Sequence, residues 1–192
     1  MTLLPLFLIY LALWTAYSAP PFRLKAVPIL DFIVSGVGAG LLPFVIGMGT
    51  SRTLNISISV VLSGVLPFML VHSGGHILQT LADYEADSKT GVQTFVVKYG
   101  REKGIFVVGL LSLITGLLPL LYISFGILPL GYVLLVFIPL PFCIPIAKRY
   151  VELLGDPSAK NVVNLQKTVI KYGIIIMFEV AAYILMLKTF GF

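Results

Sequence analysis

The chain has 192 residues, of which 58% are hydrophobic and only 11% are charged. A soluble globular domain carries roughly a quarter charged residues, so this composition indicates a membrane protein and excludes a disordered chain. Lys and Arg outnumber the acids by 13 to 8. We attribute the excess to loop charge on one side of a bilayer and expect no nucleic-acid partner. The single cysteine, Cys143, lies in an apolar run and predicts neither a disulfide nor a cysteine-based metal site.

Six segments are apolar enough to predict membrane-spanning helices, each of which needs about 20 mostly apolar residues. In chain order they are residues 3–17, 30–48, 54–72, 105–122, 129–147 and 170–187. We expect the first to be a retained helix, because no Lys or Arg precedes it and no small-residue cleavage site follows it. The fifth contains Pro129, Pro139, Pro141 and Pro145, which predict a kink. The predicted fold class is therefore all-α, a polytopic membrane bundle of six transmembrane helices.

The basic residues predict how these spans are oriented. Eleven of the 13 Lys and Arg residues follow the first, third or fifth span, and only Arg52 and Lys188 follow the others. The positive-inside rule then places the basic loops in the cytoplasm of a multi-pass protein, in the cell membrane, with both termini outside. An N-terminus on the outer side, directly before the first span, suggests that the chain is the later part of a longer protein or works beside another chain.

The acidic residues gather in one of these loops. Four of the eight acids lie between Asp83 and Glu102. If the third span continues as a helix past the membrane surface, Asp83 and Asp87 are four residues apart on one face, where two carboxylates repel each other unless a cation lies between them. His72, His76 and Gln79 precede them at helical spacing. A polar stripe entering a bilayer normally faces a wet cavity, so the stripe predicts one wall of a cleft with carboxylates at its mouth.

Several cations can be weighed for this cleft. An EF-hand beginning at Asp83 is excluded, because Ser88 replaces the turn glycine and Thr94 replaces the bidentate acid. Zinc on His72 and His76 has no evident third ligand. Mg²⁺ suits one or two carboxylates plus substrate phosphates, and Lys89, Lys98, Arg101 and Lys103 are near enough in sequence to add positive charge to a diphosphate. The alternative is a solvated loop in which the charges of the acids and the bases cancel. The spacing alone gives the metal site and the solvated loop equal weight.

Two stretches of the chain form motifs. Residues 83–100 read DYEADSKTGVQTFVVKYG, and residues 17–25 read YSAPPFRLK. The first is similar to the second aspartate-rich motif of the UbiA superfamily of intramembrane prenyltransferases, and the second resembles the YSxPPxRLK signature of that family. The resemblance implies nine helices around a central cavity, of which this chain supplies the fourth to ninth as a single domain over residues 1–192. The first aspartate-rich motif, NDxxDxxxD, is absent. The resemblance therefore implies an incomplete or inactive homologue, or a split enzyme completed by a second polypeptide.

The resemblance also implies roles for individual residues. Asp83 and Asp87 are expected to bind Mg²⁺ and act in catalysis. Substrate-binding residues are expected at Tyr17, Arg23, Lys25, Gln79, Lys89 and Lys98. Each has a plainer interpretation: Arg23 and Lys25 as positive-inside charge, Tyr17 as an interfacial aromatic, and His72 and His76 as interior histidines. Glu179 is an acid well inside a predicted span, either a functional group or a partner in a hydrogen bond between helices.

The hypothesis that follows is Mg²⁺-dependent transfer of a prenyl group from a prenyl diphosphate to an aromatic or isoprenoid lipophilic acceptor within the membrane. A six-helix phosphatidyltransferase that uses CDP-alcohols is disfavoured, because it needs a DxxDGxxAR run that the chain lacks. A non-enzymatic half that binds lipid or a partner protein without turnover stays open.

Overall fold

The computed structural model describes residues 3–50 and 61–190, and all of the regular structure in this part of the chain is helical. Its contacts divide the chain into two compact units, Met1–Thr115 and Gly116–Phe192. Each unit is described by itself. The organisation of residues 1–192 as one domain stays a prediction.

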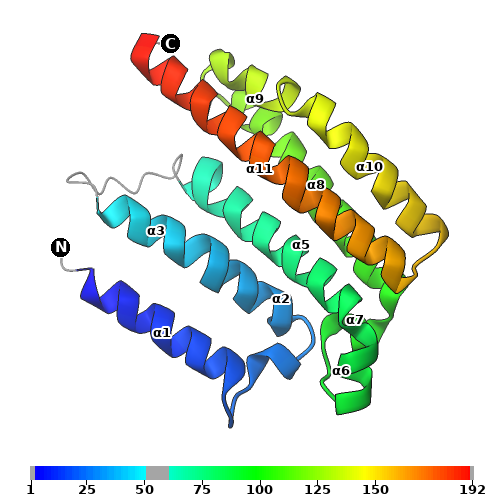
Figure 1. The fold of residues 1–192 in the computed structure, drawn as a ribbon. Helices are drawn as coiled ribbons and strands as arrows, with labels where there is room; N and C mark the ends of the chain where they lie inside the picture. Colours follow the sequence, from blue (N-terminus) through cyan, green and yellow to red (C-terminus); the bar gives the residue numbers. More distant parts are fainter. Residues whose placement is uncertain (1–2, 51–60, 191–192) are drawn as a thin grey trace. The chain divides into compact units, whose positions relative to one another are not determined.

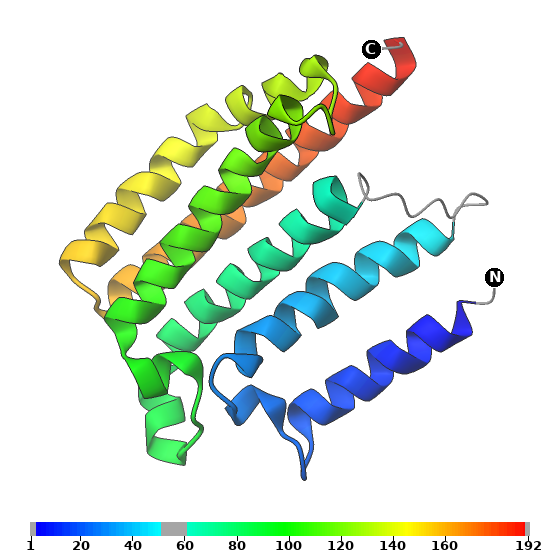
Figure 2. The ribbon, with the colours of Figure 1, turned by 180° about the vertical axis from the view of Figure 1, so that it is seen from behind.

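The first unit contains three long helical segments that lie side by side, as Figures 1 and 2 show from opposite sides. The first is α1 (Leu4–Ser18). The second runs through α2 (Leu30–Ser35), a π-helical segment (Gly36–Leu41) and α3 (Leu42–Gly49), and it lies between the other two. The third consists of a π-helical segment (Val61–Val65) and α5 (Leu66–Ala82).

Short elements close one end of this unit. A single turn of 3₁₀ helix (Leu24–Ala26) follows α1, and α5 leads into α6 (Tyr84–Thr90) and α7 (Phe95–Tyr99). The helix α8 (Arg101–Ser124) begins in this unit. Gly91, with φ of 72°, ends α6 in the left-handed conformation that a side chain would disfavour.

The middle segment approaches α5 closely because glycine occupies the contact. A Cβ atom on Gly40 would lie 2.6 Å from the carbonyl oxygen of Phe68. A Cβ on Gly36 would meet the side chain of Ser73 and the backbone of Met69. These glycines are four residues apart, the spacing of small residues at which membrane helices pack backbone against backbone.

The second unit contains the end of α8, a 3₁₀ turn (Leu130–Val133), α9 (Leu134–Phe137), α10 (Leu140–Gly155) and α11 (Ala159–Phe190). The segments Leu130–Phe137 and Leu140–Gly155 are bent by 43° relative to each other. The kink predicted from the prolines of the fifth span is therefore confirmed. The helix α10 packs against part of the longer helix α11 (Figure 1).

Among the described residues, three helices are long and apolar enough to cross a bilayer: Leu30–Gly49, Arg101–Ser124 and Ala159–Met186. The bent pair Leu130–Phe137 and Leu140–Gly155 makes a fourth, while Leu4–Ser18 is apolar but shorter. The predicted span at residues 54–72 lies partly outside the described residues, and Arg52 lies wholly outside them. The count of six spans stays a prediction.

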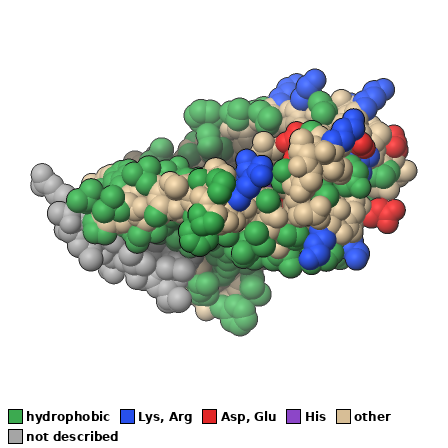
Figure 3. Space-filling model, turned by 90° about the horizontal axis from the view of Figure 1, so that it is seen from below, with side chains coloured by type: hydrophobic (Ala, Val, Ile, Leu, Met, Phe, Trp, Pro, Cys, Tyr) green, Lys and Arg blue, Asp and Glu red, His purple; other side chains and the backbone are tan. Residues whose placement is uncertain are grey.

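Large apolar side chains cover much of the protein surface. Hydrophobic groups occupy wide areas of the face shown in Figure 3. Phe7, Phe106, Phe125 and Phe178 are each about half exposed or more. Soluble proteins rarely expose contiguous apolar patches of this kind, whereas a lipid environment favours them.

Candidate active site

A cavity of about 660 Å³ lies within the first unit. It is bordered by α1, the 3₁₀ turn after it, the middle segment, α5, α6 and the loop that precedes α7. Five of the residues expected to bind metal or substrate line it: Tyr17, Lys25, Gln79, Asp83 and Asp87. The cavity thus brings together residues from both of the sequence motifs described above.

The predicted polar stripe forms one wall of this cavity, since His72, His76, Gln79, Asp83 and Asp87 all line it. The prediction that the stripe forms a cleft wall is confirmed. The roles of its residues stay predictions.

The single continuous helix assumed for the stripe is wrong, because α5 ends at Ala82 and α6 begins at Tyr84. The backbone at Asp83 has φ of −87° and ψ of 3°, outside the helical region. Contacts from α8 hold the short helix that follows this break: the guanidinium of Arg101 lies 4.4 Å from the ring centre of Tyr84, and its Nη2 donates to Glu85 Oε1 at 2.9 Å. The chain turns at Asp83 and still leaves both aspartates on the cavity wall.

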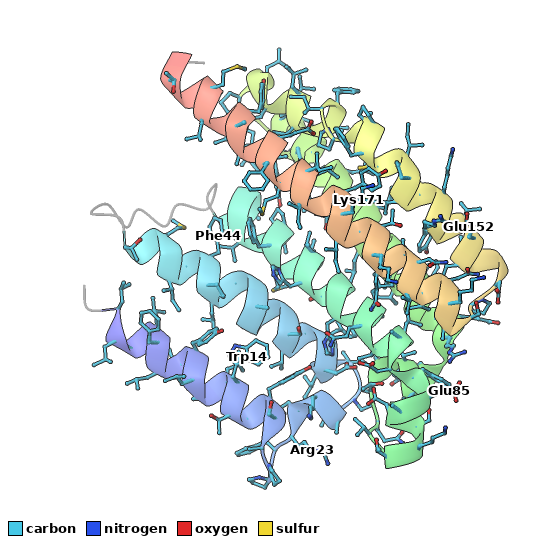
Figure 4. All side chains as sticks on the ribbon, in the orientation of Figure 1. Trp14, Arg23, Phe44, Glu85, Glu152 and Lys171 are labelled. Atoms are coloured by element: carbon cyan, nitrogen blue, oxygen red, sulfur yellow. The ribbon has the colours of Figure 1, made fainter. Side chains whose placement is uncertain are left out.

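A hydrogen bond crosses the cavity wall from α1 to α5. The hydroxyl of Tyr17 and Nε2 of His76 are 3.1 Å apart. Trp14 packs edge-on against the ring of Tyr17 at a centroid distance of 5.2 Å, and it projects from α1 toward the middle segment (Figure 4). The indole Nε1 of Trp14 is buried and has no hydrogen-bond partner among the described residues. The Tyr17–His76 hydrogen bond thus joins two of the helices that border the cavity.

The electrostatic environment of Asp87 differs from that of a solvated carboxylate. Partial burial raises the pKa of Asp87, and the negative charge of Asp83 raises it further. The positive charge of Lys25 acts in the opposite direction and lowers the pKa of Asp87. Two nearby carboxylates favour a divalent cation, and a phosphate group that arrives with that cation is attracted by the cation and by the lysine.

The sequence did not single out Asp31, which is fully buried at the start of α2. Its Oδ2 accepts a hydrogen bond of 2.7 Å from the backbone N–H of Phe95, the first residue of α7. The residue before it, Thr94, lines the cavity and caps α7 by accepting from the N–H of Val97. Asp31 thereby fixes the loop that carries Thr94. An acid at the edge of a predicted span was the signal that could have identified it.

The other predicted residues lie outside the cavity wall. Arg23, Lys89 and Lys98 have exposed side chains and are not among the lining residues; Figure 4 shows Arg23 in the loop after α1. Their proposed contacts with substrate stay predictions. Glu179 lies on α11 in the second unit, where its Oε2 is buried and has no partner among the described residues.

The two aspartates have the chemistry of a magnesium site. Mg²⁺ is usually bound by one or two carboxylates together with waters and substrate phosphates, so an all-protein cage is not required. In the part of the chain that the structure describes, no three His, Cys, Asp or Glu side chains come together as such a cage. A pair of carboxylates on an open cavity wall fits a metal that arrives with a phosphate ligand.

These features define an enzyme-like site in a membrane helix bundle, and comparison with known proteins identifies the family. The chain matches the model of the UbiA prenyltransferase family over residues 1–166. Because the match covers most of the chain, the chain belongs to this family. It is accordingly an integral membrane protein of the prenyltransferase type.

Two curated relatives have the name lycopene elongase/hydratase. The relative from Haloarcula japonica is 34% identical over 94 residues, which are 49% of this chain and 30% of that protein. The relative from Halobacterium salinarum is 32% identical over 107 residues, which are 50% of this chain and 34% of that protein. The matched region thus spans about a third of the length of each relative. No solved structure matched the chain.

Proposed function

We propose that the cavity of the first unit binds a prenyl diphosphate together with Mg²⁺, and that the protein transfers the prenyl group to a lipophilic acceptor within the membrane. The observation that supports this proposal is the placement of Asp83, Asp87 and Lys25 in the lining of one cavity together with the aromatic and apolar side chains of Trp14 and Val71. An amphiphilic substrate with an anionic head and a hydrocarbon tail needs both kinds of surface.

The roles of the residues follow from their chemistry. Asp83 and Asp87 would hold the metal, which when bound would neutralise charge on the diphosphate. Lys25 would contact the phosphate oxygens, and the Gln79 amide offers a further hydrogen-bond donor in the lining of the cavity. In the reaction the allylic C–O bond breaks and its electron pair leaves with the diphosphate. The acceptor then forms a new C–C bond to the allylic carbon and loses a proton.

The names of the two relatives favour an isoprenoid hydrocarbon acceptor over an aromatic one. Lycopene, the compound in their name, is an isoprenoid polyene. The matched region covers about a third of each relative, so the acceptor of this chain is part of the proposal. The proposal includes the cytoplasmic side of the cell membrane for the cavity mouth, as the positive-inside rule predicts.

The test is binding of a non-reactive prenyl diphosphate analogue to the detergent-solubilised protein, with Mg²⁺ and with EDTA. We expect Mg²⁺-dependent binding, and we expect Asp83→Asn and Asp87→Asn each to weaken it by at least an order of magnitude, because each removes a charged ligand of the metal. Glu102→Gln is the matched control: it removes an acidic charge near the same loop, but Glu102 is exposed, does not line the cavity and forms no ion pair among the described residues. Unchanged binding in both aspartate variants would contradict the proposal.

Turnover is measured separately, with a labelled prenyl diphosphate and membranes that contain the chain alone or the chain with a polypeptide that carries an NDxxDxxxD segment. Product in either membrane supports a transferase, and in that membrane Asp87→Asn is expected to lower the rate by about a hundredfold or more. Mg²⁺-dependent binding without product in both would instead favour the alternative, a subunit that binds prenyl lipid or a partner without turnover.

A further inference from the structure

The second unit contains a smaller cavity that has no part in the proposed reaction. It has a volume of about 350 Å³ and lies between α10 and α11. Lys148, Arg149 and Glu152 line it from α10, and Thr168, Lys171 and Tyr172 line it from α11. Figure 4 shows Glu152 and Lys171 on these two helices. We refer to this cavity as the basic cleft.

The charges of the basic cleft are not balanced. Arg149 Nη1 donates to Glu152 Oε2 at 2.6 Å, which uses the single acid of the cleft. Among the described residues, neither Lys148 nor Lys171 forms an ion pair. Lys171 instead lies with its Nζ 5.2 Å from the ring centre of Tyr172. Two lysines from different helices therefore face one hollow without an acidic partner, which favours an anion there.

The position of the cleft along its helices indicates where that anion comes from. Lys148 directly follows the apolar run of residues 140–147 of α10, and Lys171 is followed by the apolar run of residues 173–178 of α11. The side chains of Ile144 and Ile174 are exposed, as expected of groups that face lipid. The cleft lies where the apolar parts of both helices give way to polar ends, which is the level of lipid headgroups in a bilayer.

We propose that the basic cleft binds the phosphate group of an anionic phospholipid, with Lys148 and Lys171 as its charged contacts. Thr168 cannot donate to the phosphate in its present rotamer, because its hydroxyl donates to the carbonyl of Asn164 at 2.8 Å. Recognition therefore depends on the lysines and on the Arg149 guanidinium, which lines the cleft beside Glu152. None of these residues lines the cavity of the first unit, so the inference does not depend on the proposed prenyl transfer.

The experiment measures binding of a fluorescent phosphatidylglycerol to the protein in non-ionic detergent. The test variant is Lys148→Gln with Lys171→Gln. We expect its Kd to rise roughly fivefold for each lysine removed, because one basic residue near a membrane surface contributes about that factor. The matched control is Lys160→Gln with Lys167→Gln, which removes the same charge from exposed positions outside the cleft. Equal weakening in both double variants would show diffuse attraction and overturn the proposal.

Two further arms test the ligand and the fold. Unlabelled phosphatidylglycerol should displace the probe, whereas displacement by glycerol phosphate at similar concentration would assign the cleft to soluble phosphates and overturn the lipid assignment. Lys148→Arg with Lys171→Arg keeps both charges and should bind like the wild type even where the glutamine variant fails to fold. Binding by the wild type that does not weaken as salt is added would also contradict a phosphate contact through these lysines.

Discussion

The carboxylate of Asp31 and the backbone N–H of Phe95 form a 2.7 Å hydrogen bond that joins the start of α2 to the start of α7, 64 residues later in the chain. Asp31 is fully buried, and its Oδ1 has no partner among the described residues. This bond holds Thr94 on the wall of the cavity. A residue that does not line the cavity thus controls the loop that follows the aspartate pair.

Removing this bond should loosen the loop before α7. We expect Asp31→Ala to lower the free energy of unfolding by about 1.5–3 kcal/mol, the range for a hydrogen bond to a charged group. Asp31→Asn should lose less stability, because its amide oxygen can still accept a hydrogen bond from the N–H of Phe95. Chemical unfolding in mixed micelles measures the stability, and hydrogen exchange at residues 92–99 measures the loop. Equal stability of Asp31→Ala and the wild type would show that the bond is not maintained.

The Tyr17–His76 pair should couple α1 to α5. In a double-mutant cycle with Tyr17→Phe and His76→Ala, we expect a coupling free energy of about 0.5–1.5 kcal/mol in unfolding, since each single variant removes the same 3.1 Å hydrogen bond. The ring of Phe keeps the edge-on contact that Tyr17 makes with Trp14. The measurement is the same unfolding in mixed micelles.

The control for this cycle is Tyr10→Phe combined with His76→Ala. Tyr10 lies on the same helix and packs against Trp14 at a centroid distance of 6.2 Å, but it forms no bond with His76. Additive effects are expected for this combination. Coupling as large as that of the Tyr17 cycle would show that α1 and α5 are linked through general packing.

The cavity wall on α5 could be predicted from the sequence. Polar residues that repeat at helical spacing in an apolar helix share one face, and such a face normally borders a polar cavity. His72, His76 and Gln79 follow that spacing, and the helix that carries them is regular. Lys25 and Tyr17 could be predicted only through a motif resemblance, because their approach to α5 depends on the loop after α1. Asp31 was missed because a single acid at the start of a helix is common and need not have a function. Its hydrogen-bond partner is a backbone N–H group, which has no signal in the sequence.

The end of α5 could not be predicted for a related reason. Helical spacing continues through Asp87, so local pattern favours one helix. The helix after the break at Asp83 is held from outside its own segment, because Arg101 of α8 contacts α6 through Tyr84 and Glu85. Tertiary contacts of this kind override local propensity, and they are visible only once the chain is folded.

Arg101 should therefore determine how firmly α6 is held. We expect Arg101→Ala to raise hydrogen exchange across Tyr84–Thr90 and to lower stability by about 1 kcal/mol, because the ion pair is partly exposed and the contact with the Tyr84 ring adds to it. Lys103→Gln is the control, since it removes a nearby exposed charge that has no contact with α6 in the described structure. Unchanged exchange in Arg101→Ala would show that α6 is held by other contacts.

The glycines of the middle segment should be necessary for the cavity to form. A Cβ at Gly40 would lie 2.6 Å from Phe68 O and 2.8 Å from Met69 Cα, both backbone atoms that cannot move without shifting α5. Overpacking of this kind costs about 1–3 kcal/mol, so we expect Gly40→Ala to be destabilised by that amount and to bind the prenyl diphosphate analogue more weakly.

Gly47→Ala is the matched control for this substitution. It lies further along the same helical segment, and within the described structure a Cβ there would meet no heavy atom within 4 Å. Alanine is favoured over glycine in a helix, so Gly47→Ala should be as stable as the wild type or more stable, by about 0.5–1 kcal/mol. Thermal unfolding in detergent compares the two variants. A Gly40→Ala protein as stable as Gly47→Ala would mean that the middle segment and α5 are not in backbone contact at Phe68.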